Sequence, residues 1–187
     1  MLFLQDHGVS TSFAAKIYKQ YGNESVNKVR ENPFRLVDDI WGIGFKTADG
    51  IAQKLGFGKE AFVRLRSGIM YTLSNLADQG HVYATKEQLI KTAAELLEAE
   101  EGCVVMTLDQ MLADHDLILQ KVEIPKEQRK HEMPADLEQP EWKLAESQIT
   151  EAIYLPPFYY AETGVAGKLK RLLAAPAADS SVDCTGD

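Results

Sequence analysis

The chain has 187 residues, 45% of them hydrophobic, which is enough to bury a real core in one or two small domains. Its formal net charge of −8 argues against a general duplex-binding protein, because such proteins usually carry a basic face. Cys103 and Cys184 are far apart in sequence and the four histidines are scattered, so neither a disulfide nor a metal-ligand cluster is predicted, which fits a reducing cytoplasm. The sequence contains no secretory signal and no membrane span.

The first turn signal lies close to the N-terminus. Gly8, Val9 and Ser10 precede a helical pattern that includes Lys16. Serine is a favoured helix N-cap, because its hydroxyl accepts a hydrogen bond from a free amide of the first turn. We therefore expect two short helices joined by this turn.

A second, stronger turn signal follows further along the chain. Gly42 and Gly44 flank Ile43, and glycine can adopt backbone angles closed to other residues while Ile43 points inward. A helix that begins directly after this turn leaves its first amides without partners, and such amides form an anion site. Lys46 and Thr47 lie at the same end and add a positive charge and a hydroxyl.

Two such turns in register are typical of tandem helix-hairpin-helix motifs, which hold DNA phosphates with backbone amides. Residues 1–60 are predicted to form this unit, with the first turn as the weaker copy. The alternative is that the glycines only join helices tightly and that the first copy is only a structural partner. The candidate DNA-binding residues are Gly42, Ile43, Gly44, Lys46 and Thr47 in the second turn and Gly8, Val9, Ser10 and Lys16 in the first.

The charge is unevenly distributed between the two parts of the chain. Residues 1–60 carry a net charge of +1, residues 61–175 carry −6, and the tail from residue 176 adds three aspartates. The hairpin region is thus the least acidic part, and its few cations predict weak, salt-sensitive binding.

The second half is predicted to be a different unit, residues 61–155. Its pattern gives a long amphipathic helix, a short extended piece at residues 81–84, two helices opened by capping boxes at Thr85 and Thr107, and two strands at 117–124 and 147–155. This order is that of a winged helix, with residues 125–146 as an enlarged acidic loop. The candidate recognition helix, residues 107–116, contains no Lys or Arg, so a spacer or docking role is favoured over base reading.

The fold class expected is therefore mainly α: tandem helix-hairpin-helix motifs, then a winged-helix-like helical domain with a small β-hairpin. A final helix, residues 156–175, is expected to lead toward a further domain, and residues 176–187 are expected to be disordered.

The order of several short blocks resembles the N-terminal region of the RecD-like ATP-dependent DNA helicases, bacterial enzymes related to the alpha subunit of exodeoxyribonuclease V. The similarity runs from about residue 2 to about residue 174, and residues 42–49 are its most specific part. The blocks are Gly8-Val9-Ser10, Ala15-Lys16-Ile17-Tyr18, Tyr21-Gly22, Asn32-Pro33-Phe34-Arg35-Leu36, Gly42-Ile43-Gly44-Phe45-Lys46-Thr47-Ala48-Asp49 and Gly80-His81.

The resemblance implies a DNA repair or recombination protein whose superfamily 1 motor follows this region. The segment Gly164 to Leu169 lacks the glycine spacing and the hydroxyl of a phosphate-binding loop, so no catalytic residue, metal site or cofactor is expected in this chain. ATP and magnesium are expected for the missing motor. The expected partners are single-stranded or forked DNA and the motor domain itself, and no membrane.

Three functions remain open from the sequence. The first is a non-catalytic DNA-binding accessory region of a RecD-like helicase. The second is a protein-docking helical domain whose degenerate hairpins no longer bind DNA. The third, a nuclease or other repair enzyme, is the weakest, because no paired carboxylates stand out.

Overall fold

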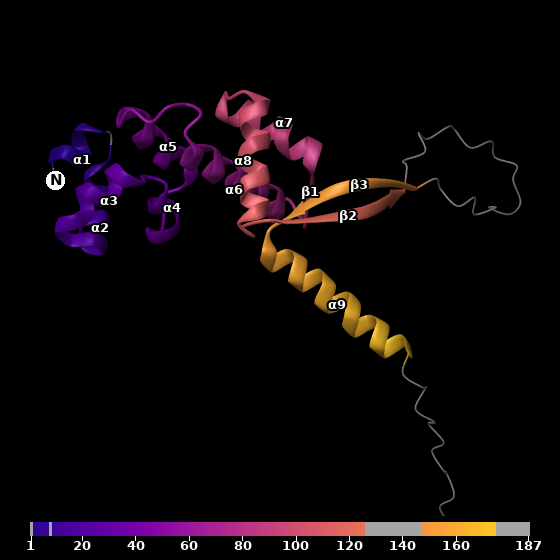
Figure 1. The fold of residues 1–187 in the computed structure, drawn as a ribbon. Helices are drawn as coiled ribbons and strands as arrows, with labels where there is room; N and C mark the ends of the chain where they lie inside the picture. The colour runs from indigo at the N-terminus through magenta and orange to yellow at the C-terminus, as the bar shows by residue number, and fades with distance from the viewer. Residues whose placement is uncertain (1, 8, 126–146, 175–187) are drawn as a thin grey trace, which may run out of the picture.

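The computed structural model describes residues 2–7, 9–125 and 147–174. Its N-terminal part consists of short helices gathered at one end of the molecule (Figure 1). They are α1 (Leu2–Asp6), α2 (Thr11–Tyr21), the 3-10 turn η1 (Gly22–Glu24), α3 (Ser25–Glu31), α4 (Arg35–Asp39) and α5 (Phe45–Lys54). Helix pairs α1/α2 and α4/α5 form the two hairpins, and α3 connects them.

A small apolar core holds the two hairpins together. Leu4, Ile17 and Val29 contribute one buried side chain from each of α1, α2 and α3, and Ile51 reaches the same core from α5. Helices this short are marginal on their own, so their stability comes from this shared packing. The tandem helix-hairpin-helix arrangement predicted from the sequence is confirmed.

The following elements have the order and sheet topology of a winged helix. Strand β3 lies between β1 and β2 and is antiparallel to both, with Ile118 opposite Tyr154 and Ala84 opposite Ile153. The β2–β3 hairpin projects from the helices in Figure 1. The mainly α fold with a winged-helix-like unit is therefore confirmed. The elements are α6 (Phe62–Asp78), β1 (Ala84–Thr85), α7 (Lys86–Leu97), α8 (Glu101–Ala113), β2 (Ile118–Pro125) and β3 (Ser147–Tyr154).

One of the two predicted capping boxes is wrong. Thr85 is the N-cap of α7, and its hydroxyl accepts from the amide of Gln88. Thr107, in contrast, lies in the middle of α8, buried, with its hydroxyl donating to the carbonyl of Cys103 at 2.9 Å. The helix already begins at Glu101, because the apolar residues before Thr107 continue it upstream. The hydroxyl of the buried Thr107 bonds to the preceding turn and does not cap a helix start.

Helix α5 belongs to both halves of the molecule. Ile51 packs in the hairpin core, whereas Ala48 and Ala52 pack in the larger core formed mainly by α6, α7 and α8. Gly68 on α6 allows the close approach of α7, since a Cβ there would lie 2.5 Å from Cδ2 of Leu97. The boundaries proposed at residues 60 and 155 stay a prediction.

Helix α9 (Pro156–Ala174) extends away from the other elements (Figure 1). Among the described helices, none is both long enough and apolar enough to cross a membrane. Three expectations fall outside the described residues: Gly8, the acidic loop apart from its first residue, and the disordered tail.

Candidate nucleic-acid interface

Two buried isoleucines anchor the turn between α4 and α5 in the hairpin core. Ile40 donates its amide to the carbonyl of Leu36, and Ile43 donates its amide to the carbonyl of Ile40 at 3.1 Å. Both isoleucine side chains are buried, as expected for Ile43. The anchored side chains leave the outer rim of the turn, at Gly42 and Gly44, exposed to solvent.

The N-terminus of α5 presents open amides at this rim. Gly44 is the N-cap, and its carbonyl accepts from the amides of Thr47 and Ala48, each at 3.1 Å. Within the part of the chain that the structure describes, the amides of Gly44, Phe45 and Lys46 donate to no protein acceptor. Unpaired amides at a helix N-terminus, with the helix dipole behind them, attract anions.

The two glycines of the turn have different reasons to be glycine. Gly42 has a φ of +96°, which L side chains rarely adopt, so the turn itself requires it. Gly44 has an extended backbone, with φ −93° and ψ 172°, and a Cβ there would meet nothing within 4 Å. The expectation that both glycines adopt special angles is therefore wrong for Gly44. The fold does not require a glycine there, and its absence of side chain instead leaves the amides accessible.

Lys46 and Lys16 supply positive charge to the same turn from different hairpins. Lys46 is exposed on the first turn of α5, beside the half-buried Thr47. Lys16 comes from α2, yet its Nζ donates to the carbonyl of Trp41 at 3.2 Å and would lie 3.7 Å from a Cβ on Gly42. The sequence pattern predicted Lys16 at the first turn, and the structure places it against the second.

The first turn has a side-chain cap on its second helix. Val9 is buried and donates its amide to the carbonyl of Leu4 at 2.9 Å, and Ser10 is the N-cap of α2, as predicted. The Ser10 hydroxyl accepts from the amide of Phe13 at 3.3 Å. The corresponding amide at the second turn is that of Thr47, which donates to the carbonyl of Gly44, so the two turns differ in the acceptor that pairs this amide.

Comparison with known proteins agrees with this geometry. The family model of the ATP-dependent RecD2 DNA helicase HHH domain matches residues 1–83. Residues 1–83 therefore match the helix-hairpin-helix region of RecD-like helicases. The match ends directly before β1, so α7, α8, α9 and the sheet lie outside it.

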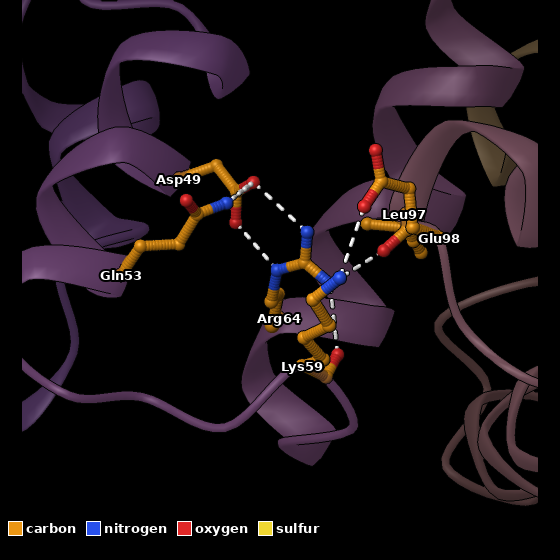
Figure 2. Close-up of polar contacts among 6 residues, drawn as sticks. All are labelled: Asp49, Gln53, Lys59, Arg64, Leu97 and Glu98. Atoms are coloured by element: carbon orange, nitrogen blue, oxygen red, sulfur yellow. Dashed lines mark hydrogen bonds and ion pairs between the residues drawn. The ribbon is translucent and has the colours of Figure 1, made fainter.

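The helix-hairpin-helix region is fastened to the winged-helix-like unit by a buried arginine (Figure 2). Arg64, 4% exposed at the start of α6, donates from Nε and from a second nitrogen to the carboxylate of Asp49 on α5, at 2.6 and 3.0 Å. Its remaining nitrogen donates to the carbonyls of Lys59 and Leu97, both at 2.8 Å. This bidentate geometry fixes α5 against α6 and α7.

Sequence reasoning missed this contact. Asp49 lies in the most specific block of the family resemblance, but its partner is in the next helix and neither residue has an unusual local pattern. Gln53 also donates to Asp49, at 3.0 Å, so the carboxylate is fully engaged. Asp49 is therefore a positioning residue for α5.

The winged-helix-like unit presents an acidic face at α8. Asp109 forms an ion pair with Lys86 at 3.2 Å. Gln110 is the one residue of the candidate recognition helix, residues 107–116, that is suited to base reading, and its side chain donates to Asp114. The preference for a spacer or docking role stays a prediction.

One group of possible metal ligands was not visible in the sequence, because its members come from separate segments. Glu60, Glu100 and Cys103 place their ligand atoms within 4.8 Å of one another. Burial and the neighbouring Glu60 raise the pKa of the Cys103 thiol.

Proposed function

We propose that the helix-hairpin-helix region binds the DNA phosphate backbone without sequence preference, as a non-catalytic accessory region of a RecD-like superfamily 1 helicase. The observation that carries the proposal is the open N-terminus of α5. Three amides, a glycine that the fold does not need, and the exposed Lys46 converge at one solvent-facing turn. A phosphate satisfies these amides, and no base edge is needed.

The charge balance sets the expected strength. Many cations of the region are already engaged: Lys28 pairs with Glu24, Arg35 with Asp39, and Lys59 with Glu98. Few phosphates can then be neutralised, so affinity falls in the non-specific range, about 10⁻⁴ to 10⁻⁶ M at physiological salt. A motor domain in the parent helicase, with its own ATP and magnesium, would supply most of the grip on single-stranded or forked DNA in the bacterial cytoplasm.

The test compares wild type with Gly44→Asp. Aspartate is a good N-cap and adopts an extended backbone, so the substitution suits the fold but places a carboxylate beside the phosphate site. Hydrogen bonds to a charged group contribute about 1.5–3 kcal/mol, so binding of single-stranded and forked DNA at low salt weakens about tenfold or more. Fluorescence anisotropy over a salt series measures both affinity and its salt slope.

Gly50→Asp is the matched control, because it adds the same charge to the same helix. Gly50 is exposed, and a Cβ at this position would meet nothing within 4 Å, so the side chain there leaves the α5 N-terminus unchanged. Equal DNA binding by wild type and Gly44→Asp, or no binding by wild type, contradicts the proposal. The second outcome instead favours a protein-docking domain whose hairpins no longer bind DNA.

A further inference from the structure

Trp41 is an unusual side chain for the rim of a turn. It is 92% exposed, although the neighbouring Ile40 and Ile43 are buried. Tryptophan is highly buried on average, because its large apolar ring gains much from leaving water. An indole held in solvent at this position gives nothing to the stability of the fold through burial.

A lysine from α2 lies near both the indole and the binding turn. The carbonyl of Trp41 accepts from Nζ of Lys16 at 3.2 Å, and the same Nζ lies 5.6 Å from the centre of the indole ring and 5.6 Å from that of Phe13. These distances fall within the range of cation–π attraction, about 6 Å. Lys16 therefore links the indole, the turn carbonyl and α2.

The ring is close in sequence to the open amides and carries a cation beside it. Trp41 precedes the Gly44 N-cap by three residues in a turn whose outer rim is exposed. Asp39 is engaged, since it accepts from the hydroxyl of Tyr21 and its Oδ2 lies 4.0 Å from Nε of Arg35, whereas Asp38 is exposed and lines the same hollow as Gly44. A polyanion held at the amides thus brings its bases near an exposed aromatic face.

We propose that Trp41 stacks on an unpaired base of the DNA strand whose phosphate is held by the amides of Gly44 to Lys46. The inference rests on the proposed function and narrows its ligand to single-stranded nucleic acid, including the unpaired arm of a fork. Bases inside a duplex already stack on each other and leave no face for the indole. Stacking on an aromatic side chain accepts every base, which agrees with binding that has no sequence preference.

The experiment separates base stacking from phosphate binding by using two oligonucleotides of equal length and charge. One is oligothymidylate and the other is an abasic strand, which keeps the phosphates and lacks the bases. The sequence holds two tryptophans, so a Trp142→Phe background leaves Trp41 as the one tryptophan, whose fluorescence is excited selectively over that of the tyrosines. Stacking on thymine quenches its fluorescence, and the abasic strand produces no comparable quenching.

Affinities of variants then test whether the ring itself contributes. We expect Trp41→Ala to weaken oligothymidylate binding about tenfold and abasic binding less than about twofold, with Trp41→Phe in between. Tyr160→Ala, which removes a 66% exposed aromatic ring on α9, is the control and leaves both affinities unchanged. Thermal unfolding followed by circular dichroism checks that each variant folds, and the exposure of Trp41 predicts little change.

Each outcome has a defined meaning. Wild-type binding of both strands with equal affinity, no quenching and no effect of Trp41→Ala overturns the stacking inference and leaves the phosphate site standing. Equal weakening of both strands by Trp41→Ala overturns it too, since the residue then acts through the turn and Lys16. Failure of wild type to bind either strand overturns the proposed function and, with it, this inference.

Discussion

The second helix of the first hairpin begins at a serine, and the second helix of the second hairpin begins at a glycine. The Ser10 side chain occupies an amide of α2, whereas the N-terminus of α5 has no side-chain cap. The first hairpin also sends Lys16 across to the turn of the second. Two motifs of similar backbone therefore differ in side chains: the first has a hydroxyl at its N-cap and supplies a lysine to the second, whose N-cap has no side chain.

A second difference concerns how each hairpin is anchored. Helix α2 packs in the small hairpin core, while α5 also contacts the larger core and holds Arg64 through Asp49. The open turn is thus the better supported one. The proposed phosphate site needs a rigid frame, and part of that frame here comes from outside the motif.

The largest expected effect comes from removing that frame. Arg64→Ala leaves Asp49 and two backbone carbonyls without their donor, and breaking a buried ion pair by removing one partner costs about 3–5 kcal/mol. Urea unfolding measures the free energy of unfolding. Arg66 lies on the same helix as Arg64 and forms a more exposed ion pair with Asp116, so Arg66→Ala costs at most about 1 kcal/mol. Equal losses in the two variants would contradict the special role of Arg64.

The next effect separates the two glycines of the open turn. Gly42→Ala forces a Cβ into a backbone with φ +96° and costs about 1–2 kcal/mol. Gly44→Ala meets no neighbour and loses only the better cap, at most about 0.5 kcal/mol. Thermal and urea unfolding of the two variants give the comparison. A larger loss for Gly44→Ala would show that the fold itself needs that glycine.

Ser10→Ala tests the side-chain cap of the first turn. The variant loses the hydroxyl that accepts from Phe13 and costs about 1 kcal/mol, as for other N-caps. Because the proposed phosphate site lies at the second turn, DNA binding at low salt changes less than in Gly44→Asp. A stronger loss of DNA affinity in Ser10→Ala than in Gly44→Asp would reverse the assigned roles of the two hairpins.

The contact between the hairpins is sensitive to pH. Burial and the hydrogen bond to Asp39 raise the pKa of Tyr21 to about 12 from its ordinary 10.0. The folded state therefore favours the protonated phenol, so its contribution is complete below about pH 10 and is lost as the pH rises through about 12. With solvent screening of this partly exposed group, we expect less than about 1 kcal/mol. Tyr21→Phe removes this pH dependence of unfolding, and ultraviolet titration of the phenol measures the pKa.

The smallest effect has the opposite sign. Gly44→Ser gives α5 the cap that α2 already has and stabilises the protein by a few tenths of a kcal/mol. As at Ser10, the added hydroxyl accepts from the amide three residues on, that of Thr47, and leaves the amides of Gly44 to Lys46 open, so stability rises while DNA affinity changes little. A large loss of DNA affinity in this variant would show that the Thr47 amide takes part in binding.

Local sequence patterns predicted most of the helices and strands, whereas they did not predict contacts between residues far apart in the sequence. The Ser10 cap, the inward Ile43 and the winged-helix order follow from spacing over a few residues. Thr107 misled because a capping pattern in a buried helix interior looks the same as one at a helix start. The Arg64–Asp49 pair and the contact of Lys16 with the second turn join separate helices, so no local pattern reveals them. In the sequence Trp41 is only one more hydrophobic residue, and the structure is needed to show that its ring is in solvent.

The shared position of α5 also makes it a mechanical element. Its ten residues span about 15 Å, with the open turn at one end. Asp49, in the middle of the helix, is bonded to Arg64 on the next helix. A pull on a strand held at the open turn would load α5 along its axis and pass as shear through this contact into α6 and α7. The arginine would then act as the joint through which tension in the strand reaches the rest of the protein.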